Sequence, residues 1–273
     1  MSPAPQRRVW RAAREGALAA SAADVRRLAR RAAKLALDAL SPPQCPVSGE
    51  RVAAPGQLSG AGWARLNFID RPFCVRCGAP FVLDYGPDAV CPPCLAEPPA
   101  FDAARAAVVY DAVSAPLLLS YKNADRTELA TVFAAWLARA GADFARDGAL
   151  VTSVPLHRRR LFSRRFNQAA LLAQRFASAG GLECDVSLLR RRRATASQQS
   201  LSEAGRRRNV RGAFELAPEA AARVFGRPIV VVDDVATTGA TLSACARPLK
   251  RAGAARVDAL VVARVVRGAG DAI

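Results

Sequence analysis

The segment 228–242 constrains this chain most, because it joins an apolar strand, two adjacent carboxylates, a Thr/Gly loop and the start of a helix. The apolar run ends at Asp233 and Asp234, and the loop contains Gly239. Such a loop brings backbone N–H groups, hydroxyls and a helix N-terminus to one point, which favours a bound phosphate. Two acids at the end of the strand can accept hydrogen bonds from a vicinal diol, such as two ribose hydroxyls. The segment lacks the Gly-Lys-Ser/Thr and G-x-G-x-x-G patterns of other phosphate loops. The alternative interpretation is a threonine-rich turn that two acids cap.

The chain beyond Phe101 alternates apolar runs with helical patterns. We predict strands at 105–111, 149–156, 182–189, 228–235 and 256–266, and helices at 126–140, 166–179 and 240–252. Strands separated by helices of this length predict right-handed crossovers and a mostly parallel sheet flanked by helices. The fold class is therefore α/β.

Four of the seven cysteines form a C-x2-C-x13-C-x2-C motif, namely Cys74, Cys77, Cys91 and Cys94. Two residues between paired thiolates let one tight turn offer both sulfurs to the same ion, and two such turns complete a tetrahedral site. All four ligands come from the protein, so the motif predicts one structural zinc ion and no catalytic metal. Four buried thiols or an iron–sulfur cluster are the alternatives.

An incomplete copy of the same motif lies upstream. Cys45 begins a similar turn, but Ser48, Ser59 and Gly62 stand at the positions that would carry its other sulfurs. One thiol cannot hold zinc by itself, so we predict no metal there. The two remaining cysteines, Cys184 and Cys245, are predicted to be core residues.

The chain divides by composition into a basic helical arm at 1–40, a loop-rich metal module at 41–99 and an α/β domain at 100–268. The arm places Val25 and Leu28 on one face and basic residues on the other, which favours packing on the rest of the protein over a membrane surface. The sequence predicts neither a transmembrane span nor a secretory signal, although a transit peptide stays open. The odd number of cysteines and the paired spacing of four of them favour reduced thiols over disulfides, so we expect a cytoplasmic protein.

Positive charge dominates the sequence, with 40 Lys+Arg against 23 Asp+Glu and a net charge of +17. This excess favours an anionic partner: a phosphate ester, nucleic acid or a membrane surface. Arginine supplies all but three of the cations, so compositional bias is the alternative explanation. The excess is concentrated between His157 and Arg211, a segment that contains 14 Arg and only three acidic residues. That local concentration favours contact with phosphate.

Segment 228–242 resembles the phosphoribosyl pyrophosphate (PRPP) signature of the type I phosphoribosyltransferases. The resemblance implies that Asp233 and Asp234 hold the ribose 2′ and 3′ hydroxyls. It also implies that a loop surrounds the 5′-phosphate, formed by Val235, Ala236, Thr237, Thr238, Gly239, Ala240 and Thr241. Purine-specific members carry an acid at the position of Thr237, and this departure argues against purine salvage.

The whole layout from Cys45 to Val266 resembles the ComF/GntX family, in which a zinc ribbon precedes a phosphoribosyltransferase domain. Further matching motifs are Tyr121-Lys122-Asn-Ala-Asp125-Arg126, Val154-Pro155-Leu156-His157-Arg158-Arg159, Arg165-Phe166-Asn167-Gln168-Ala169, Gln198-Gln199-Ser-Leu-Ser202 and Arg206-Arg207-Arg208-Asn209-Val210. The resemblance makes 41–99 a zinc-ribbon module with one intact four-cysteine site and one degenerate site. It makes 100–268 a type I phosphoribosyltransferase-like domain.

A PRPP site must also hold pyrophosphate, which leaves during the reaction. Arginine forks bind phosphate bidentately, so Arg158 or Arg165 is the expected ligand, and Lys122 is expected to reach the same pocket. Segment 190–212 occupies the place of the flap that closes over PRPP in type I enzymes. Mg²⁺ would accompany PRPP and keep several waters. The single histidine, His157, could act in acid–base chemistry but is predicted to be a bystander.

Two functions remain open at this point. The first is transfer of phosphoribosyl from PRPP to an unknown acceptor, which would make the protein a pentosyltransferase. The second is a non-catalytic accessory role in DNA uptake during competence, with single-stranded DNA, a nucleotide, or competence and recombination proteins as partners. The intact acid pair and loop favour retained binding of PRPP or a nucleotide.

Overall fold

In the computed structural model of this 273-residue chain, Val25 and residues 42–54, 56–123, 126–156, 167–193 and 203–266 are described. The chain divides into two compact units, Met1–Ser59 and Gly60–Ile273. Apart from Val25, the predicted basic arm lies outside the described residues, so its helix stays a prediction. Within the described ranges, no helix has both the length and the apolar character that crossing a bilayer requires.

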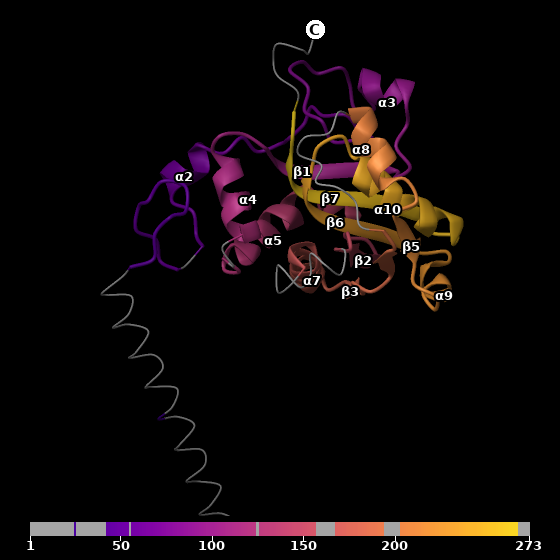
Figure 1. The fold of residues 1–273 in the computed structure, drawn as a ribbon. Helices are drawn as coiled ribbons and strands as arrows, with labels where there is room; N and C mark the ends of the chain where they lie inside the picture. The colour runs from indigo at the N-terminus through magenta and orange to yellow at the C-terminus, as the bar shows by residue number, and fades with distance from the viewer. Residues whose placement is uncertain are drawn as a thin grey trace, which may run out of the picture. The chain divides into compact units, whose positions relative to one another are not determined.

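The larger unit is built on a five-stranded sheet with the order β1-β7-β6-β2-β3, in which all neighbours are parallel (Figure 1). Its strands are β1 (Ala103–Val109), β2 (Leu150–Ser153), β3 (Glu183–Cys184), β6 (Pro228–Ala236) and β7 (Arg256–Arg264). The register places Val232 of β6 beside Ser153 of β2 and beside Leu260 of β7. The predicted α/β fold with a parallel sheet is confirmed.

Helices cover both faces of this sheet. They are α4 (Ser114–Asn123), α5 (Leu129–Ala140), the 3-10 helix η1 (Ala142–Phe144), α7 (Gln168–Gly180) and α10 (Ala240–Arg251). Side chains alternate between the two faces of a strand, and Ile229 and Val231 of β6 share a buried cluster with Leu242 and Leu249 of α10. Helices α5 and α7 pack against each other and against the sheet.

The segment predicted as one strand at 182–189 is divided between two sheets. β3 pairs with β2, whereas β4 (Leu189–Arg191) pairs antiparallel with β5 (Phe214–Leu216). The break is a turn in which Asp185 Oδ1 accepts hydrogen bonds from the backbone N–H of Ser187, at 2.8 Å, and from its hydroxyl, at 2.6 Å. Aspartate stabilises turns through such bonds, so the single predicted strand is wrong. Two short helices follow β4 and β5, namely α8 (Glu203–Val210) and α9 (Ala221–Val224).

The second half of the ribbon module covers the free edge of β1. The N–H of Ile69 donates to the carbonyl of Ala107 at 2.9 Å, and the N–H of Ala104 donates to the carbonyl of Arg76 at 2.7 Å. An uncovered strand edge is prone to unwanted pairing, so these bonds protect the sheet. The two helices of this region are α2 (Gly60–Ala64) and α3 (Pro92–Ala96).

Candidate functional site

The two adjacent acids lie toward the carboxyl end of β6, where both side chains are half-buried. Asp233 Oδ1 accepts a hydrogen bond from the N–H of Asp234 at 2.9 Å, and Asp234 Oδ1 accepts one from the N–H of Val235 at 2.7 Å. One oxygen of each carboxylate is thereby fixed by the backbone. The side chains are not sealed in the apolar core, since that of Asp234 is 14% exposed.

Helix α4 brings a positive charge to this acid pair. Lys122, in the last turn of α4, places Nζ 2.7 Å from Asp234 Oδ2. The end of the helix is held on α7, because the hydroxyl of Tyr121 donates to the carbonyl of Gln168 at 2.9 Å and Gln168 Nε2 donates to the carbonyl of Lys122 at 3.3 Å. Three elements therefore fix the position of the lysine: α4, α7 and β6.

Burial governs the electrostatics of the acid pair. Burial and, after it, the negative charge of Asp234 raise the pKa of Asp233, Lys122 opposes the rise, and the resulting pKa is about 7. Burial also raises the pKa of Tyr121, with Asp234 as a second cause. Asp233 therefore exchanges its proton close to neutral pH.

The loop after β6 turns directly into α10. Gly239 precedes the helix with φ of 74°, in the left-handed region that glycine adopts without strain. Thr238 Oγ1 accepts a hydrogen bond from the N–H of Ala240 at 3.4 Å. The N-terminus of a helix carries unsatisfied N–H groups and a partial positive charge. The loop and the acid pair are therefore adjacent, as the sequence predicts.

The strand next to β6 ends at the same place. The N–H of Val154 donates to the carbonyl of Val232 at 2.9 Å, and Asn167 Nδ2 donates to the carbonyl of Val154 at 3.3 Å. Asn167 also caps α7 by accepting a hydrogen bond from the N–H of Ala169 at 3.1 Å. The loop that leaves β2 therefore starts and returns beside the acid pair. The predicted pyrophosphate ligands Arg158 and Arg165, together with His157, lie outside the described residues.

Sequence reasoning gave no role to several residues that shape this site. Tyr121, Asn167 and Gln168 occur in the family motifs, but the sequence does not show that they join α4, α7 and β2. Arg191 of β4 lowers the pKa of Asp233 through its charge, and the sequence placed this arginine in the predicted flap without singling it out. It belongs to the basic run that begins the predicted flap, and its position in that run is the only signal that could have identified it.

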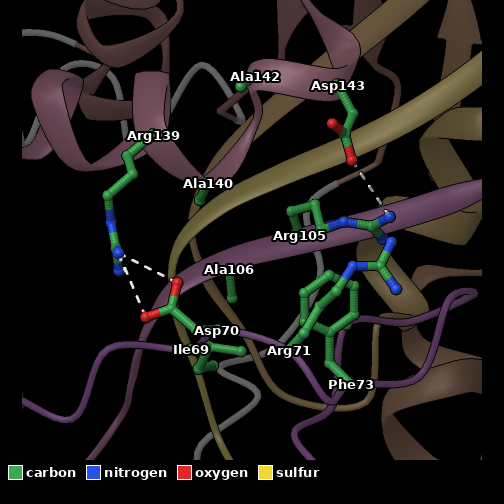
Figure 2. Close-up of a pocket in the computed structure, with 11 residues that line it drawn as sticks. Ile69, Asp70, Arg71, Phe73, Arg105, Ala106, Arg139, Ala140, Ala142 and Asp143 are labelled. Atoms are coloured by element: carbon green, nitrogen blue, oxygen red, sulfur yellow. Dashed lines mark hydrogen bonds and ion pairs between the residues drawn. The ribbon is translucent and has the colours of Figure 1, made fainter. Parts of the chain in front are cut away.

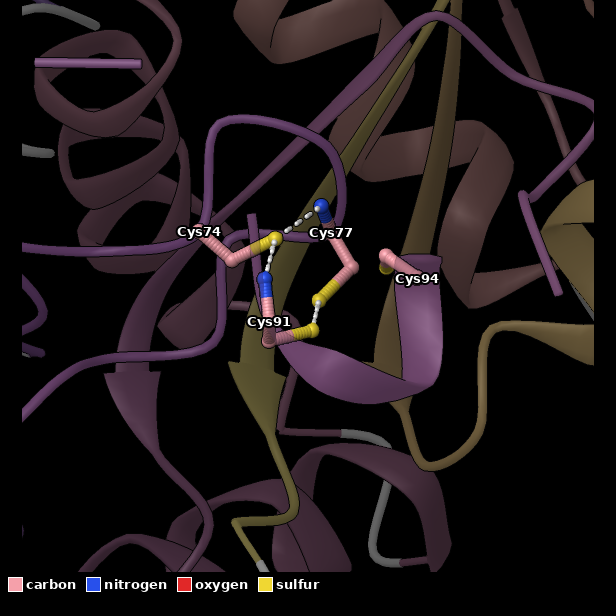
Figure 3. Close-up of side chains that lie close together, drawn as sticks. All are labelled: Cys74, Cys77, Cys91 and Cys94. Atoms are coloured by element: carbon pink, nitrogen blue, oxygen red, sulfur yellow. Dashed lines mark hydrogen bonds between the residues drawn. The ribbon is translucent and has the colours of Figure 1, made fainter. Parts of the chain in front are cut away.

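The four motif cysteines lie together and are buried (Figure 3). Their sulfurs all lie within 4.8 Å of one another, and Cys77 Sγ is 3.6 Å from Cys91 Sγ. A tetrahedral zinc site with Zn–S bonds of about 2.3 Å separates its sulfurs by about 3.8 Å. The donor set therefore fits a structural zinc ion.

Backbone N–H groups donate hydrogen bonds to one sulfur of this cluster. Cys74 Sγ accepts hydrogen bonds from the N–H of Cys77 at 3.5 Å and from the N–H of Cys91 at 3.3 Å. Hydrogen bonds from the neighbouring thiols hold the pKa of Cys74 far below its usual range. A thiolate is the form that binds zinc, so Cys74 is the sulfur that favours the ligating state, whereas the neighbouring thiols raise the pKa of Cys77 and Cys94.

The incomplete copy of the cysteine motif, which begins at Cys45, is held together by hydrogen bonds. The Oγ atoms of Ser48 and Ser59 are 2.8 Å apart, and the N–H of Ser48 donates to Cys45 Sγ at 3.5 Å. Burial raises the pKa of Cys45, but hydrogen bonds from the Ser48 side chain and from backbone N–H groups bring it down to about 6. Two hydroxyls thus stand where a second zinc site would have thiolates.

Two family models match the chain. A double zinc ribbon domain matches residues 36–95, and a phosphoribosyl transferase domain matches residues 167–271. The first range contains both cysteine regions, and the second contains the acid pair and its loop.

Comparison with known proteins gives relatives over most of the chain. DNA utilization protein YhgH of Escherichia coli (strain K12) is 34% identical over 208 residues, which cover 74% of this chain and 88% of that protein. Competence protein F of Haemophilus influenzae is 29% identical over 218 residues, which cover 78% of this chain and 92% of that protein. Among solved structures, the glutamine phosphoribosylpyrophosphate amidotransferase from B. subtilis is 24% identical, with a TM-score of 0.32, over 48% of this chain and 25% of that chain.

The relatives and the two domain models agree with each other and with the geometry of the site. The double zinc ribbon family matches the region with the four-cysteine cluster, and the phosphoribosyl transferase family matches the region with β6, the acid pair and the loop that follows. The relative from E. coli exceeds 30% identity over almost its whole length. The chain belongs to the ComF family.

Proposed function

We propose that this chain binds PRPP at the carboxyl ends of β6 and β2. Asp233 and Asp234 would accept hydrogen bonds from the ribose 2′ and 3′ hydroxyls, and loop 235–241 would surround the 5′-phosphate. The observation that carries the proposal is the half-buried acid pair directly before the left-handed turn at Gly239 and the start of α10.

The topology of the sheet supports this location. After β2 the chain moves outward to β3, whereas after β6 it moves in the opposite direction to β7. Ligands of open parallel sheets bind where the connections diverge, outside the carboxyl ends of the strands. In this chain the connections diverge between β2 and β6, and the acid pair and Val154 lie at that point.

Several cationic groups could hold the pyrophosphate. Lys122 already lies beside Asp234, and Arg158 and Arg165 belong to the loop that starts from β2 next to the acids. Arg191 acts electrostatically on Asp233. Mg²⁺ would enter with PRPP, bound by ligand oxygens and water. If the chain is an enzyme, a nitrogen nucleophile displaces pyrophosphate from C1 of the ribose.

Thermal unfolding tests the binding step. At a concentration about 100 times the dissociation constant, PRPP with Mg²⁺ should stabilise the zinc-loaded protein by about 2.7 kcal/mol. The Asp234→Asn variant should lose that stabilisation, and Asp88→Asn, an exposed change in the ribbon, should keep it. Equal stabilisation of both variants would refute the assignment of the acid pair.

A second candidate is binding of single-stranded DNA without catalysis. The names of the relatives, DNA utilization protein and competence protein, support it, as does the net charge of +17. Binding through phosphates would weaken steeply as salt rises. Two assays separate the candidates. Pyrophosphate release in the presence of candidate bases supports the transferase, whereas salt-sensitive binding of single-stranded DNA without such release supports the accessory role.

A further inference from the structure

A cavity of about 170 Å³ lies at the edge of the sheet, where the ribbon and helix α5 meet β1 (Figure 2). Three arginines line it, and each comes from a different element: Arg71 from the ribbon, Arg105 from β1 and Arg139 from α5. The lining includes neither the acid pair nor the Gly239 loop. The cavity is therefore a separate feature from the proposed PRPP site.

Arg105 is the fixed element of this cavity. Its side chain is 11% exposed, and its guanidinium lies 4.5 Å from the ring centroid of Phe73 and 5.4 Å from that of Phe144. Nη1 donates to the carbonyl of Val75 at 3.2 Å and to that of Ala104 at 2.9 Å. These contacts hold the charged group in one position without neutralising it.

The remaining donors of Arg105 are poorly used. Nη2 lies 3.9 Å from a carboxylate oxygen of Asp143, whose side chain is 68% exposed. Charge-assisted hydrogen bonds are about 2.7–2.9 Å long, so this pair is a loose one. Nε is buried and has no hydrogen-bond partner among the described groups. A buried donor without a partner is unfavourable, and burial lowers the pKa of Arg105.

A second guanidinium lies against the same ring. Arg71 Cζ is 5.2 Å from the centroid of Phe73, and Figure 2 shows the two guanidinium groups close together beside this ring. Arg71 Nη1 donates to the carbonyl of Pro87 at 3.4 Å. Arg139 differs, because Asp70 neutralises it at 3.0 Å. The positive charge of the cavity is therefore concentrated on Arg71 and Arg105.

We propose that a small oxyanion, either inorganic phosphate or the phosphate group of a monoester, binds between Arg71 and Arg105. Arginine binds phosphate oxygens bidentately. Because Nη1 of Arg105 donates to backbone carbonyls, Nε and Nη2 are the donors that Arg105 offers, and Arg71 supplies the second guanidinium. The cavity volume is below the roughly 300 Å³ at which pockets for drug-sized ligands begin, so it fits such a group and not a whole nucleotide. Because Arg71 belongs to the ribbon and Arg105 to the sheet, the bound anion joins these two parts of the unit.

Arginine footprinting tests this site separately from the PRPP site. The zinc-loaded full chain is labelled with phenylglyoxal, with and without inorganic phosphate at constant ionic strength, and labelling is read residue by residue by mass spectrometry. Phosphate should protect Arg71 and leave the exposed Arg76 of the same ribbon unprotected. Ribose 5-phosphate, used in place of phosphate, shows whether the site takes free phosphate alone or monoesters too.

Two variants give opposite expected shifts in the phosphate concentration for half-protection of Arg71. Arg105→Lys keeps the charge and loses the fork, so that concentration should rise about tenfold. Asp143→Asn removes the competing carboxylate from an exposed position, so the phosphate concentration for half-protection should fall about two- to five-fold. Unchanged labelling of Arg71 in phosphate, equal protection of Arg76, or no effect of Asp143→Asn would overturn the proposal. Loss of PRPP binding alone would leave it standing, because Arg71 is read directly.

Discussion

Lys122 Nζ lies 2.7 Å from Asp234 Oδ2 and joins the end of α4 to the end of β6. The two side chains are 28% and 14% exposed, so water screens their attraction only in part. The ammonium neutralises one of two adjacent carboxylates, and the pair can therefore occupy a half-buried place. In the proposed complex the same ammonium lies beside the anionic ligand.

Replacement of this lysine should be more damaging at alkaline pH. Lys122→Met leaves two neighbouring carboxylates without their cation, which disfavours the ionised acids and the fold that contains them. We expect a loss of about 1–3 kcal/mol in the free energy of unfolding at pH 8 and a smaller loss at pH 5. Urea unfolding at the two pH values measures the difference.

Lys250→Met is the matched control. Lys250 pairs with Asp102 at 2.5 Å, and the two side chains are 32% and 33% exposed, but this pair lies away from the acid pair. It should lose at most about 1 kcal/mol, as exposed pairs do, and leave PRPP binding intact. Equal effects of both variants on PRPP binding would contradict a role for Lys122 at the site.

Asp233→Asn should stabilise the protein at alkaline pH. The pKa of Asp233 is raised from 3.8 to about 7, so the folded state favours the protonated acid. The cost of ionising it in the folded state is absent below pH 3.8, grows as the pH rises toward 7 and is constant above. The variant should match the wild type at pH 4 and exceed its free energy of unfolding by at least about 1 kcal/mol at pH 8. Lower stability of the variant at pH 8 would contradict this account.

Gly78→Ala tests the contact between the ribbon and the sheet. Gly78 has φ of 71°, and an added Cβ would lie 2.6 Å from the carbonyl oxygen of Ala104 on β1. Backbone atoms cannot move aside easily, so we expect a loss of more than about 2 kcal/mol. Gly86→Ala is the control in the same ribbon, because its φ is 95° and its added Cβ meets nothing within 4 Å. If thermal unfolding shows equal losses, the contact with β1 does not matter.

Zinc analysis should give one ion per chain. Cys94→Ser removes one ligand of the four-sulfur cluster and should abolish stoichiometric zinc, with a loss of several kcal/mol in stability, because binding a structural metal contributes to folding. Cys45→Ser should leave the zinc content at one, since Ser48, Ser59 and Gly62 occupy the other positions of that incomplete motif. Emission spectrometry of purified protein decides this, and two zinc ions per wild-type chain would contradict it.

Local sequence patterns predicted the elements whose structure depends on nearby residues. The apolar run before Asp233 predicted β6, and Gly239 predicted the turn into α10. The spacing of the cysteines predicted a compact cluster, because two residues between thiols allow one tight turn. These features follow from the local backbone and from burial, so no distant contact is needed to recognise them.

Apart from the approach of Lys122 to the acid pair, contacts between distant segments were not predictable. Helix α4 has no strongly amphipathic pattern. Asp111 fixes its start, because Oδ1 accepts a hydrogen bond from the N–H of Ser114 at 2.9 Å, and the hydroxyl of Tyr121 fixes its end by donating to the carbonyl of Gln168 on α7. The place of Arg105 between the rings of Phe73 and Phe144 depends on how the ribbon meets β1. Neither arrangement has a signature in the order of residues along the chain.

Calorimetric titration of PRPP with Mg²⁺ into zinc-loaded protein at pH 8, where Asp233 is ionised, tests the central claim most directly. We predict saturable binding of one PRPP per chain, and loss of measurable binding in the Asp233→Asn/Asp234→Asn double variant, because the ribose hydroxyls lose both charged acceptors. A flat titration with folded wild-type protein, or the same binding heat in the double variant, would contradict the proposed function.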